Sequence, residues 1–158
     1  MSLGYYEAAD LESIVSMIRN KNNDKIFLWG RSMGAATIIC YLSQTKQIDS
    51  IIGCILDSPY SNLWKLICEF GKSRVNLPDF ILEQVVELLR KRIQKDHGFD
   101  LKSLDLASKI RNIVTPTMFI TSTQDSFITS KHVIELYHEL NSRIKILEYI
   151  EKEHNSPR

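Results

Sequence analysis

Apolar residues form two kinds of pattern along the chain, short continuous runs and longer stripes with a helical period. The runs have the length and the β-branched content of strands, and they lie at 25–29, 51–56, 117–121 and 144–150. The stripes predict helices at 5–19, 35–42 and 130–140. Since strands alternate with helices, we predict an α/β fold with a mainly parallel sheet and helices on both faces. The first run is expected to be buried on both faces.

Two amphipathic patterns, at 63–70 and 80–93, follow the second strand with no strand between them. In the second pattern, Leu82, Val86 and Leu89 fall on one helical face. We therefore expect one α/β domain over residues 1–158, with a helical insertion after its second strand.

Composition and charge exclude several classes of protein. The 158 residues are 44% hydrophobic and carry a formal net charge of +1, which argues against a disordered chain and against a dedicated nucleic-acid binder. No apolar stretch is long enough to cross a bilayer, and no secretory segment follows Met1. Cys40, Cys54 and Cys68 have apolar neighbours and no motif spacing, so we expect buried thiols, no metal site and a cytoplasmic protein.

The pentapeptide Gly30-Arg31-Ser32-Met33-Gly34 has the form G-x-S-x-G and lies between a predicted strand and a predicted helix. This is the setting of a nucleophile elbow, a sharp turn that exposes a serine hydroxyl above the sheet. We expect Gly30 and Gly34 to be required because a Cβ at either position would collide with the neighbouring strand or helix. The alternative is an ordinary tight turn in which Ser32 caps the helix.

A serine nucleophile needs a base, and four histidines are available. His154 follows the last strand, where a loop could bring it over the serine, and is our candidate. His132 and His138 lie within a predicted helix and are expected at the surface. His97 lies in a polar turn of the insertion.

The base in turn needs an orienting acid, and two aspartates follow strands. Asp125 follows the third strand and Asp57 the second, and the carboxyl ends of parallel strands are where ligands and catalytic groups collect. We favour Asp125 because it directly precedes a helix and is nearer to His154 in the chain. Asp57 leads into the insertion, which is more typical of a structural turn.

Five segments together resemble the α/β-hydrolase superfamily, in particular serine aminopeptidase-like and monoacylglycerol-lipase-like hydrolases. They are SLGYYEAADL, LWGRSMGAAT, LDSPYSNLW, QDSFIT and EHNSPR, in the family's order. The resemblance implies Ser32 as nucleophile, Asp125 as acid and His154 as base, and the backbone N–H of Met33 as half of an oxyanion hole. It also implies that Leu63 to about Lys109 forms a helical cap.

The reaction implied is the hydrolysis of an ester, thioester or amide bond in a small acyl-containing substrate, through an acyl-enzyme and without a metal or an organic cofactor. The family's usual pattern has four strands before the first matching segment, and a loop there supplies the other half of the oxyanion hole. The chain therefore resembles the C-terminal part of the fold. The alternative function is a catalytically incompetent hydrolase-like fragment or a binding module.

The second amphipathic pattern also suggests a partner. Its apolar face could contact a membrane surface, and a cluster of basic residues could favour anionic lipid heads. The cluster consists of Arg90, Lys91, Arg92 and Lys95. The simpler interpretation is a solvated helix face.

Overall fold

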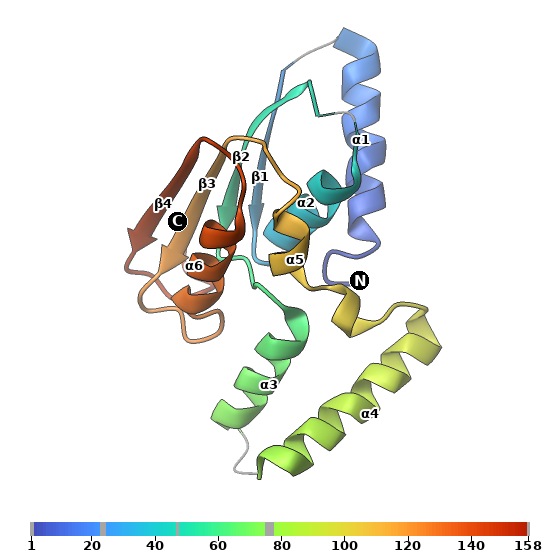
Figure 1. Cartoon of the computed structure of the whole chain (residues 1–158), viewed down its shortest axis with the longest axis vertical. Coiled ribbons are helices and arrows are strands. Elements are labelled where there is room, and N and C mark those ends of the chain that lie inside the picture. Colours follow the sequence, from blue (N-terminus) through green and yellow to red (C-terminus); the bar gives the residue numbers. More distant parts are fainter. Residues whose placement is uncertain (1, 23–24, 47, 75–77, 158) are drawn as a thin grey trace.

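A computed structural model describes residues 2–22, 25–46, 48–74 and 78–157. Within these residues, four strands and seven helical segments follow one another (Figure 1). The strands are β1 (Ile26–Arg31), β2 (Ile51–Asp57), β3 (Thr117–Ser122) and β4 (Lys145–Ile150). The helices are α1 (Glu7–Asn22), α2 (Met33–Gln44), α3 (Leu63–Arg74), α4 (Asp79–His97), the 3-10 turn η1 (Leu101–Ser103), α5 (Leu106–Ile110) and α6 (Ser130–Glu139).

The strands form one parallel sheet in the order β1-β2-β3-β4. In the register of the sheet, Arg31 at the end of β1 lies beside Asp57 at the end of β2, and Asp57 lies beside Ile120 of β3. The parallel pairing brings the carboxyl ends of all four strands to one edge. The predicted fold class, an α/β chain with a parallel sheet, is confirmed.

The core lies between the sheet and α2, α5 and α6. Helix α2 packs on β1 and β2, α6 packs on β3, and α1 lies against the outer side of α2 (Figure 1). Small residues such as Ala35 and Ala36 let α2 approach the sheet closely, and both are fully buried together with Ile39. On the strands, Leu56 and Phe119 fill the centre of this layer.

On the opposite side of the sheet, apolar side chains are exposed, because none of the described residues covers them. Phe27 and Trp29 of β1 are 54% and 67% exposed, and Ile52 and Ile146 on β2 and β4 are about half exposed. The prediction that the first strand is buried on both faces is therefore wrong. A continuous apolar run identifies the strand, but it does not show what covers each side.

The insertion has two parts. Helices α3 and α4 form a hairpin that extends beyond the carboxyl ends of the strands (Figure 1). Leu82 of α4 packs closely on Gly71 of α3, where a Cβ would lie 2.7 Å from a Leu82 methyl carbon. The chain then returns, and Leu106 and Ile110 of α5 are fully buried against α2 and α6. Residues 63–109 thus include both the projecting hairpin and a helix of the core.

Acidic neighbours neutralise part of the basic cluster on α4. Arg90 pairs with Asp100 at 2.6 Å and with Glu87 at 2.5 Å, and Arg92 pairs with Asp96 one turn along the helix. Several apolar side chains of α4 remain exposed, among them Phe80 and Leu88. None of the described helices is both long enough and apolar enough to span a membrane.

The three cysteines differ in environment. Cys40 and Cys54 are buried, as expected, and burial raises the pKa of both thiols to about 11. Cys68 on α3 is only partly buried. A raised pKa keeps a thiol protonated and unreactive at neutral pH, so Cys40 and Cys54 act as core residues.

Candidate active site

Ser32 occupies a strained turn between β1 and α2. Its backbone angles are φ 52° and ψ −115°, a conformation that residues with a side chain rarely adopt. The turn is held by a hydrogen bond from the Ser32 N–H to the Asp57 carbonyl (2.8 Å) and by one from the Ala36 N–H to the Ser32 carbonyl (3.0 Å). The Ser32 side chain makes no capping bond to α2, so the alternative of a helix-capping serine is not what the structure shows.

The two glycines of the pentapeptide have different reasons to be there. A Cβ on Gly30 would lie 2.4 Å from the Gly34 carbonyl carbon and 2.6 Å from the Ala35 nitrogen, both of them backbone atoms. The predicted collision is confirmed at this position. At Gly34 a Cβ would meet nothing within 4 Å, so the same prediction is wrong there. Only Gly30 is required by the close approach of β1 to α2.

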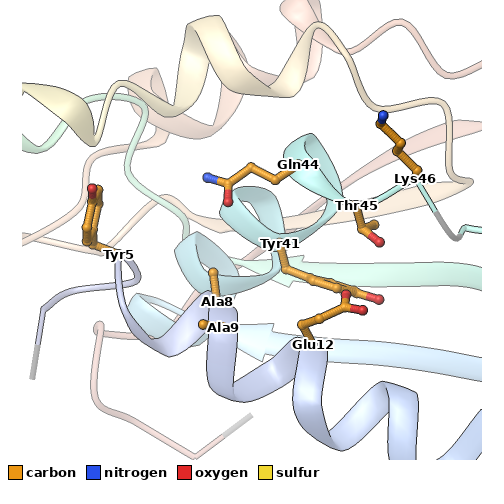
Figure 2. A pocket seen from close by; sticks show the side chains of 8 residues that line it. All are labelled: Tyr5, Ala8, Ala9, Glu12, Tyr41, Gln44, Thr45 and Lys46. Atoms are coloured by element: carbon orange, nitrogen blue, oxygen red, sulfur yellow. The ribbon is translucent and has the colours of Figure 1, made fainter.

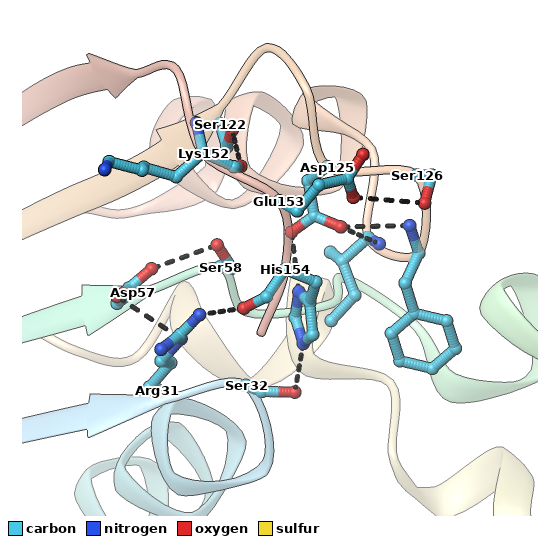
Figure 3. A network of polar contacts seen from close by, with 12 residues as sticks. Arg31, Ser32, Asp57, Ser58, Ser122, Asp125, Ser126, Lys152, Glu153 and His154 are labelled. Carbon is cyan, nitrogen blue, oxygen red and sulfur yellow. Dashed lines mark hydrogen bonds and ion pairs between the residues drawn. The ribbon is translucent and has the colours of Figure 1, made fainter. Parts of the chain in front are cut away.

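The structure brings the three candidate residues into one chain of hydrogen bonds (Figure 3). Ser32 Oγ lies 3.0 Å from His154 Nε2, and His154 Nδ1 lies 2.6 Å from Asp125 Oδ2. Because an ionised carboxylate only accepts hydrogen bonds, the Nδ1 proton points to Asp125. Nε2 of the neutral ring is then the acceptor for the serine hydroxyl.

The loop after β3 keeps Asp125 ionised. Burial favours the neutral acid, but the hydrogen bonds from His154 and from the Ile128 and Phe127 N–H groups outweigh it and lower the pKa of Asp125. Asp125 Oδ1 accepts those two N–H groups at 2.8 and 2.9 Å, while Oδ2 faces the imidazole. The carboxylate is thus fixed in position and can stabilise a positive charge on His154.

Ser32 lies at the wall of an apolar cavity of about 310 Å³ between the sheet edge and α3. Apart from Ser32 and the buried Tyr60, its lining is carbon-rich, from Leu3, Met33, Leu63, Leu66, Ile67, Phe70, Phe127 and Ile128. The Phe127 ring meets the His154 ring edge-on, with 5.2 Å between their centres. The catalytic candidates therefore adjoin a space suited to a hydrocarbon group.

The turn before α1 forms one wall of this cavity. Tyr60 donates a hydrogen bond to the Leu3 carbonyl at 2.6 Å, which ties the turn to the β2–α3 loop. Glu7 accepts hydrogen bonds from the Ser2 hydroxyl and from the Ser2 and Gly4 N–H groups. Burial opposes ionisation of Glu7, yet these bonds outweigh it and lower its pKa to about 2. Hydrogen bonds with Tyr60 and with Glu7 thus hold the turn that forms this wall.

Asp57, the alternative acid, has a different neighbour. Its carboxylate is fully buried and lies 3.8 Å from the Arg31 guanidinium, and it accepts a hydrogen bond from Ser58 Oγ at 3.0 Å (Figure 3). Arg31 in turn donates hydrogen bonds to the backbone carbonyls of His154 and Ser156. Sequence reasoning missed Arg31, although its place beside the nucleophile was a signal that its side chain lies at the same edge of the sheet.

A second hydroxyl–imidazole–carboxylate group lies under α3. The expectation that His132 is at the surface is wrong: it is 1% exposed, with Nδ1 2.8 Å from Ser61 Oγ and Nε2 3.1 Å from Glu69. Ser61 Oγ also donates to Glu135 at 2.8 Å. His138 on the same helix is exposed, as expected, and so is His97.

A further hollow of about 410 Å³ lies between α1 and the end of α2 (Figure 2). Its lining includes Glu12, Tyr41 and Lys46, and none of Ser32, Asp125 or His154. Among the described residues, no group of three or more His, Cys, Asp and Glu side chains could hold a metal ion.

Comparisons with known proteins agree with this architecture. No protein-family model matches the chain. Among curated proteins, it is 28% identical over 138 residues to the uncharacterized protein YqkD of Bacillus subtilis (strain 168), a match that covers 86% of this chain and 44% of that protein.

Several solved structures are similar. The Pyrococcus furiosus esterase Pf2001 superposes with a TM-score of 0.70 and 21% identity, over 98% of this chain and 56% of the esterase. The Paleococcus ferrophilus monoacylglycerol lipase has a TM-score of 0.61 and 19% identity, over 94% of this chain and 67% of the lipase. Acetyl xylan esterase 1 from Thermoanaerobacterium sp. JW/SL YS485 has a TM-score of 0.65 and 14% identity, over 98% of this chain and 48% of the esterase.

These structural neighbours are esterases and lipases of the α/β-hydrolase fold, and the chain shares that fold. It spans about half the length of the first relatives that it matches. At these identities the similarity concerns the fold, so any activity has to be argued from the site itself.

Proposed function

We propose that the chain is a serine hydrolase that cleaves carboxylic esters through a Ser32–His154–Asp125 triad. The observation that carries the proposal is the hydrogen-bonded order hydroxyl, imidazole, carboxylate at the wall of the apolar cavity. Thioesters and amides share the reacting carbonyl and belong to the same proposal. A serine aminopeptidase-like or monoacylglycerol-lipase-like specificity would be a particular case of it.

The proposed reaction begins with proton transfer from the Ser32 hydroxyl to His154 Nε2 as Oγ bonds to the carbonyl carbon. The carbonyl oxygen becomes an anion, which the N–H of Met33 can stabilise: Met33 is the first residue of α2, and N–H groups of a first helical turn lack an intrahelical acceptor. Collapse of this intermediate breaks the bond to the leaving oxygen, which takes the proton from His154. A water molecule then repeats the sequence and releases the acid.

We assign the apolar cavity to the acyl chain of the substrate. Its lining provides almost no hydrogen-bonding group, so a polar or charged substituent there would lose its water without compensation. A volume of about 310 Å³ corresponds to about ten groups of the size of a water molecule or a methylene. We therefore expect medium-length acyl chains to be preferred over acetyl and over long chains.

An inactive hydrolase-like chain or a binding module is the second candidate. It is favoured by the exposed apolar side of the sheet, where Phe27, Trp29 and Ile52 lack cover among the described residues. This candidate predicts a folded chain without turnover.

Hydrolysis of a series of p-nitrophenyl esters from acetate to dodecanoate tests the proposal. We expect the largest kcat/KM at an intermediate chain length, because each further methylene gains burial until the cavity is full. Ile67→Trp on α3 should fill part of the cavity and move the optimum to shorter chains. Leu88→Trp on the exposed side of α4 is the matched control and should leave the optimum unchanged.

Absence of turnover for every ester by a folded protein would contradict the hydrolase proposal and support the second candidate. Turnover without any effect of Ile67→Trp would place the acyl chain elsewhere.

Contact between α4 and a membrane surface, together with a cytoplasmic location, stays a prediction. The acidic partners of Arg90 and Arg92 leave less positive charge for anionic lipids than the basic cluster alone suggests.

A further inference from the structure

The loop that carries His154 contains no helix or strand from residue 151 to residue 157. Three hydrogen bonds tie its first part to the end of β3 and to the loop after it. Ser122 Oγ donates to the Lys152 carbonyl and accepts the Lys152 N–H, and Ser126 Oγ donates to Glu153 at 3.3 Å. The loop residues that these bonds hold, Lys152 and Glu153, precede His154 in the chain. The imidazole is held by Asp125 and Ser32, but these bonds do not hold the backbone of His154 or the residues that follow it.

Arg31 makes that contact from the other side (Figure 3). One guanidinium nitrogen donates to the backbone carbonyl of His154 and to that of Ser156, the latter at 3.0 Å. The turn at residues 153–156 is closed by a hydrogen bond from the Ser156 N–H to the Glu153 carbonyl at 3.0 Å, and it contains both His154 and Ser156. Because Arg31 directly precedes Ser32, one side chain joins the strand of the nucleophile to the loop of the base.

The buried carboxylate of Asp57 aims this arginine. A carboxylate that is fully buried needs a compensating charge, and the Arg31 Nε lies 3.8 Å from its Oδ2. The planar guanidinium can face the carboxylate with one edge and the two carbonyls with another, which a lysine ammonium cannot do in a fixed geometry. The register of the sheet sets the arrangement, since Arg31 and Asp57 are paired residues at the ends of β1 and β2.

We infer that Arg31, aimed by Asp57, is a positioning residue that holds the backbone of His154 so that its imidazole bridges Ser32 and Asp125. The inference rests on the proposed function and adds a residue to it. Arg31 acts through the loop backbone and does not touch the reacting atoms. Loss of this contact frees the loop after Glu153, and a displacement of about 1 Å between reacting groups costs about a hundredfold in rate.

Arg31→Met keeps most of the aliphatic length of the side chain and removes the guanidinium. We expect kcat for the best p-nitrophenyl ester to fall about a hundredfold while KM stays within about twofold. Arg31→Lys should retain the positive charge towards Asp57, and its kcat should lie between those of Arg31→Met and the wild type. Arg111→Met removes an exposed arginine that pairs with Glu139 at 2.5 Å, and it is the matched control, with kcat as in the wild type.

Rates are compared per folded molecule, from the fraction of native protein in a urea titration. A merely structural role of Arg31 would lower that fraction and leave the rate of each folded molecule unchanged, which would overturn the inference. An equal loss in Arg111→Met and Arg31→Met would also overturn it.

A second readout does not depend on turnover. The proton between His154 Nδ1 and Asp125 should give a strongly downfield proton NMR signal in the wild type and in Arg111→Met, and this signal should be lost or broadened in Arg31→Met. An unchanged signal in Arg31→Met would overturn the inference even for an inactive protein. If the wild type shows the signal and no turnover, the hydrolase proposal fails while the positioning of His154 by Arg31 is still tested.

Discussion

Two parts of the molecule contain a serine hydroxyl, an imidazole and a carboxylate in hydrogen-bonded order. Ser32, His154 and Asp125 meet at the end of the strands, whereas Ser61, His132 and Glu69 meet beneath α3. The distances are similar, at 3.0 and 2.6 Å in the first group and 2.8 and 3.1 Å in the second. Residue types and distances therefore do not distinguish a catalytic group from a structural one.

The two groups differ in whether the serine hydroxyl can be reached and in whether it already donates a hydrogen bond to a further residue. Ser32 is partly exposed, lies in a strained turn and lines a cavity of about 310 Å³. Ser61 is fully buried, and its hydroxyl donates to Glu135, which itself pairs with Lys65. The first group can meet a substrate, while the second joins α3 and α6 to the β2–α3 loop. We propose that the first performs chemistry and the second holds the helices together.

Removal of each serine should separate the two groups most strongly. Ser32→Ala should lower kcat for ester hydrolysis by about a millionfold, with the native fold retained. Ser61→Ala should keep kcat within about twofold and destabilise the fold by about 1–3 kcal/mol, because buried partners lose a hydrogen bond. Ester kinetics and urea unfolding of both variants measure these effects. A large loss of kcat per folded Ser61→Ala molecule would break the distinction.

The two buried aspartates offer the next largest contrast. Asp125→Asn should lower kcat by about ten-thousandfold, because an amide no longer holds the Nδ1–H tautomer of His154. Asp57→Asn should lower it by about tenfold through weaker aiming of Arg31. Steady-state kinetics on one ester measures both. The opposite order of the two effects would assign the acid to Asp57.

A smaller effect is expected at the two glycines beside Ser32. Gly30→Ala should destabilise the fold by about 3 kcal/mol, because the added Cβ overlaps backbone atoms of α2. Gly34→Ala has room for its methyl group and should raise stability by about 0.5–1 kcal/mol through better helix propensity. The midpoints of urea unfolding compare them. A severe loss in Gly34→Ala would show that the space beside it is needed.

His132 should give the molecule a pH-dependent stability. Burial lowers the pKa of His132, and the positive charge of Lys65 lowers it further. Glu69 and Glu135 act in the opposite direction, but burial outweighs them. As the pH falls below about 6.5, the unfolded chain takes up a proton that the folded chain does not. The stabilisation is therefore complete above about pH 6.5 and is lost as the pH falls towards the lowered pKa.

Unfolding by urea at pH 7.5 and pH 5 measures this effect. His132→Asn should be less sensitive to the change of pH than the wild type, although less stable at pH 7.5. His138→Asn, on the exposed side of the same helix, is the matched comparison. A wild type that is equally stable at both values would contradict the lowered pKa.

Much of the fold could be predicted because strands and helices differ in apolar period. The strand at 51–56 and the helix at 130–140 differ from the observed β2 and α6 by about one residue at an end. What covers a strand could not be predicted, because Phe27 and Trp29 have the apolar character of core residues and yet are exposed. The apolar pattern within one strand does not show whether another part of the fold covers that strand.

The site was accessible to sequence reasoning where chain order and local chemistry coincide. Hydrogen bonds join Ser32 in its pentapeptide, Asp125 after β3 and His154 after β4, and their catalytic role stays a prediction. The environment of His132 could not be predicted, because its partners Ser61 and Glu69 are 71 and 63 residues away in the chain. Arg31 was missed for a similar reason: its contact with His154 spans 123 residues. Such contacts depend on tertiary structure.

Covalent labelling with a fluorophosphonate tests the central claim most directly. The purified chain is treated with the reagent, and intact mass and peptide mapping identify the modified residue. We expect one adduct per molecule, on Ser32, that is absent in Ser32→Ala and retained in Ser61→Ala. An unlabelled but folded chain, or an adduct on Ser61, would contradict the account.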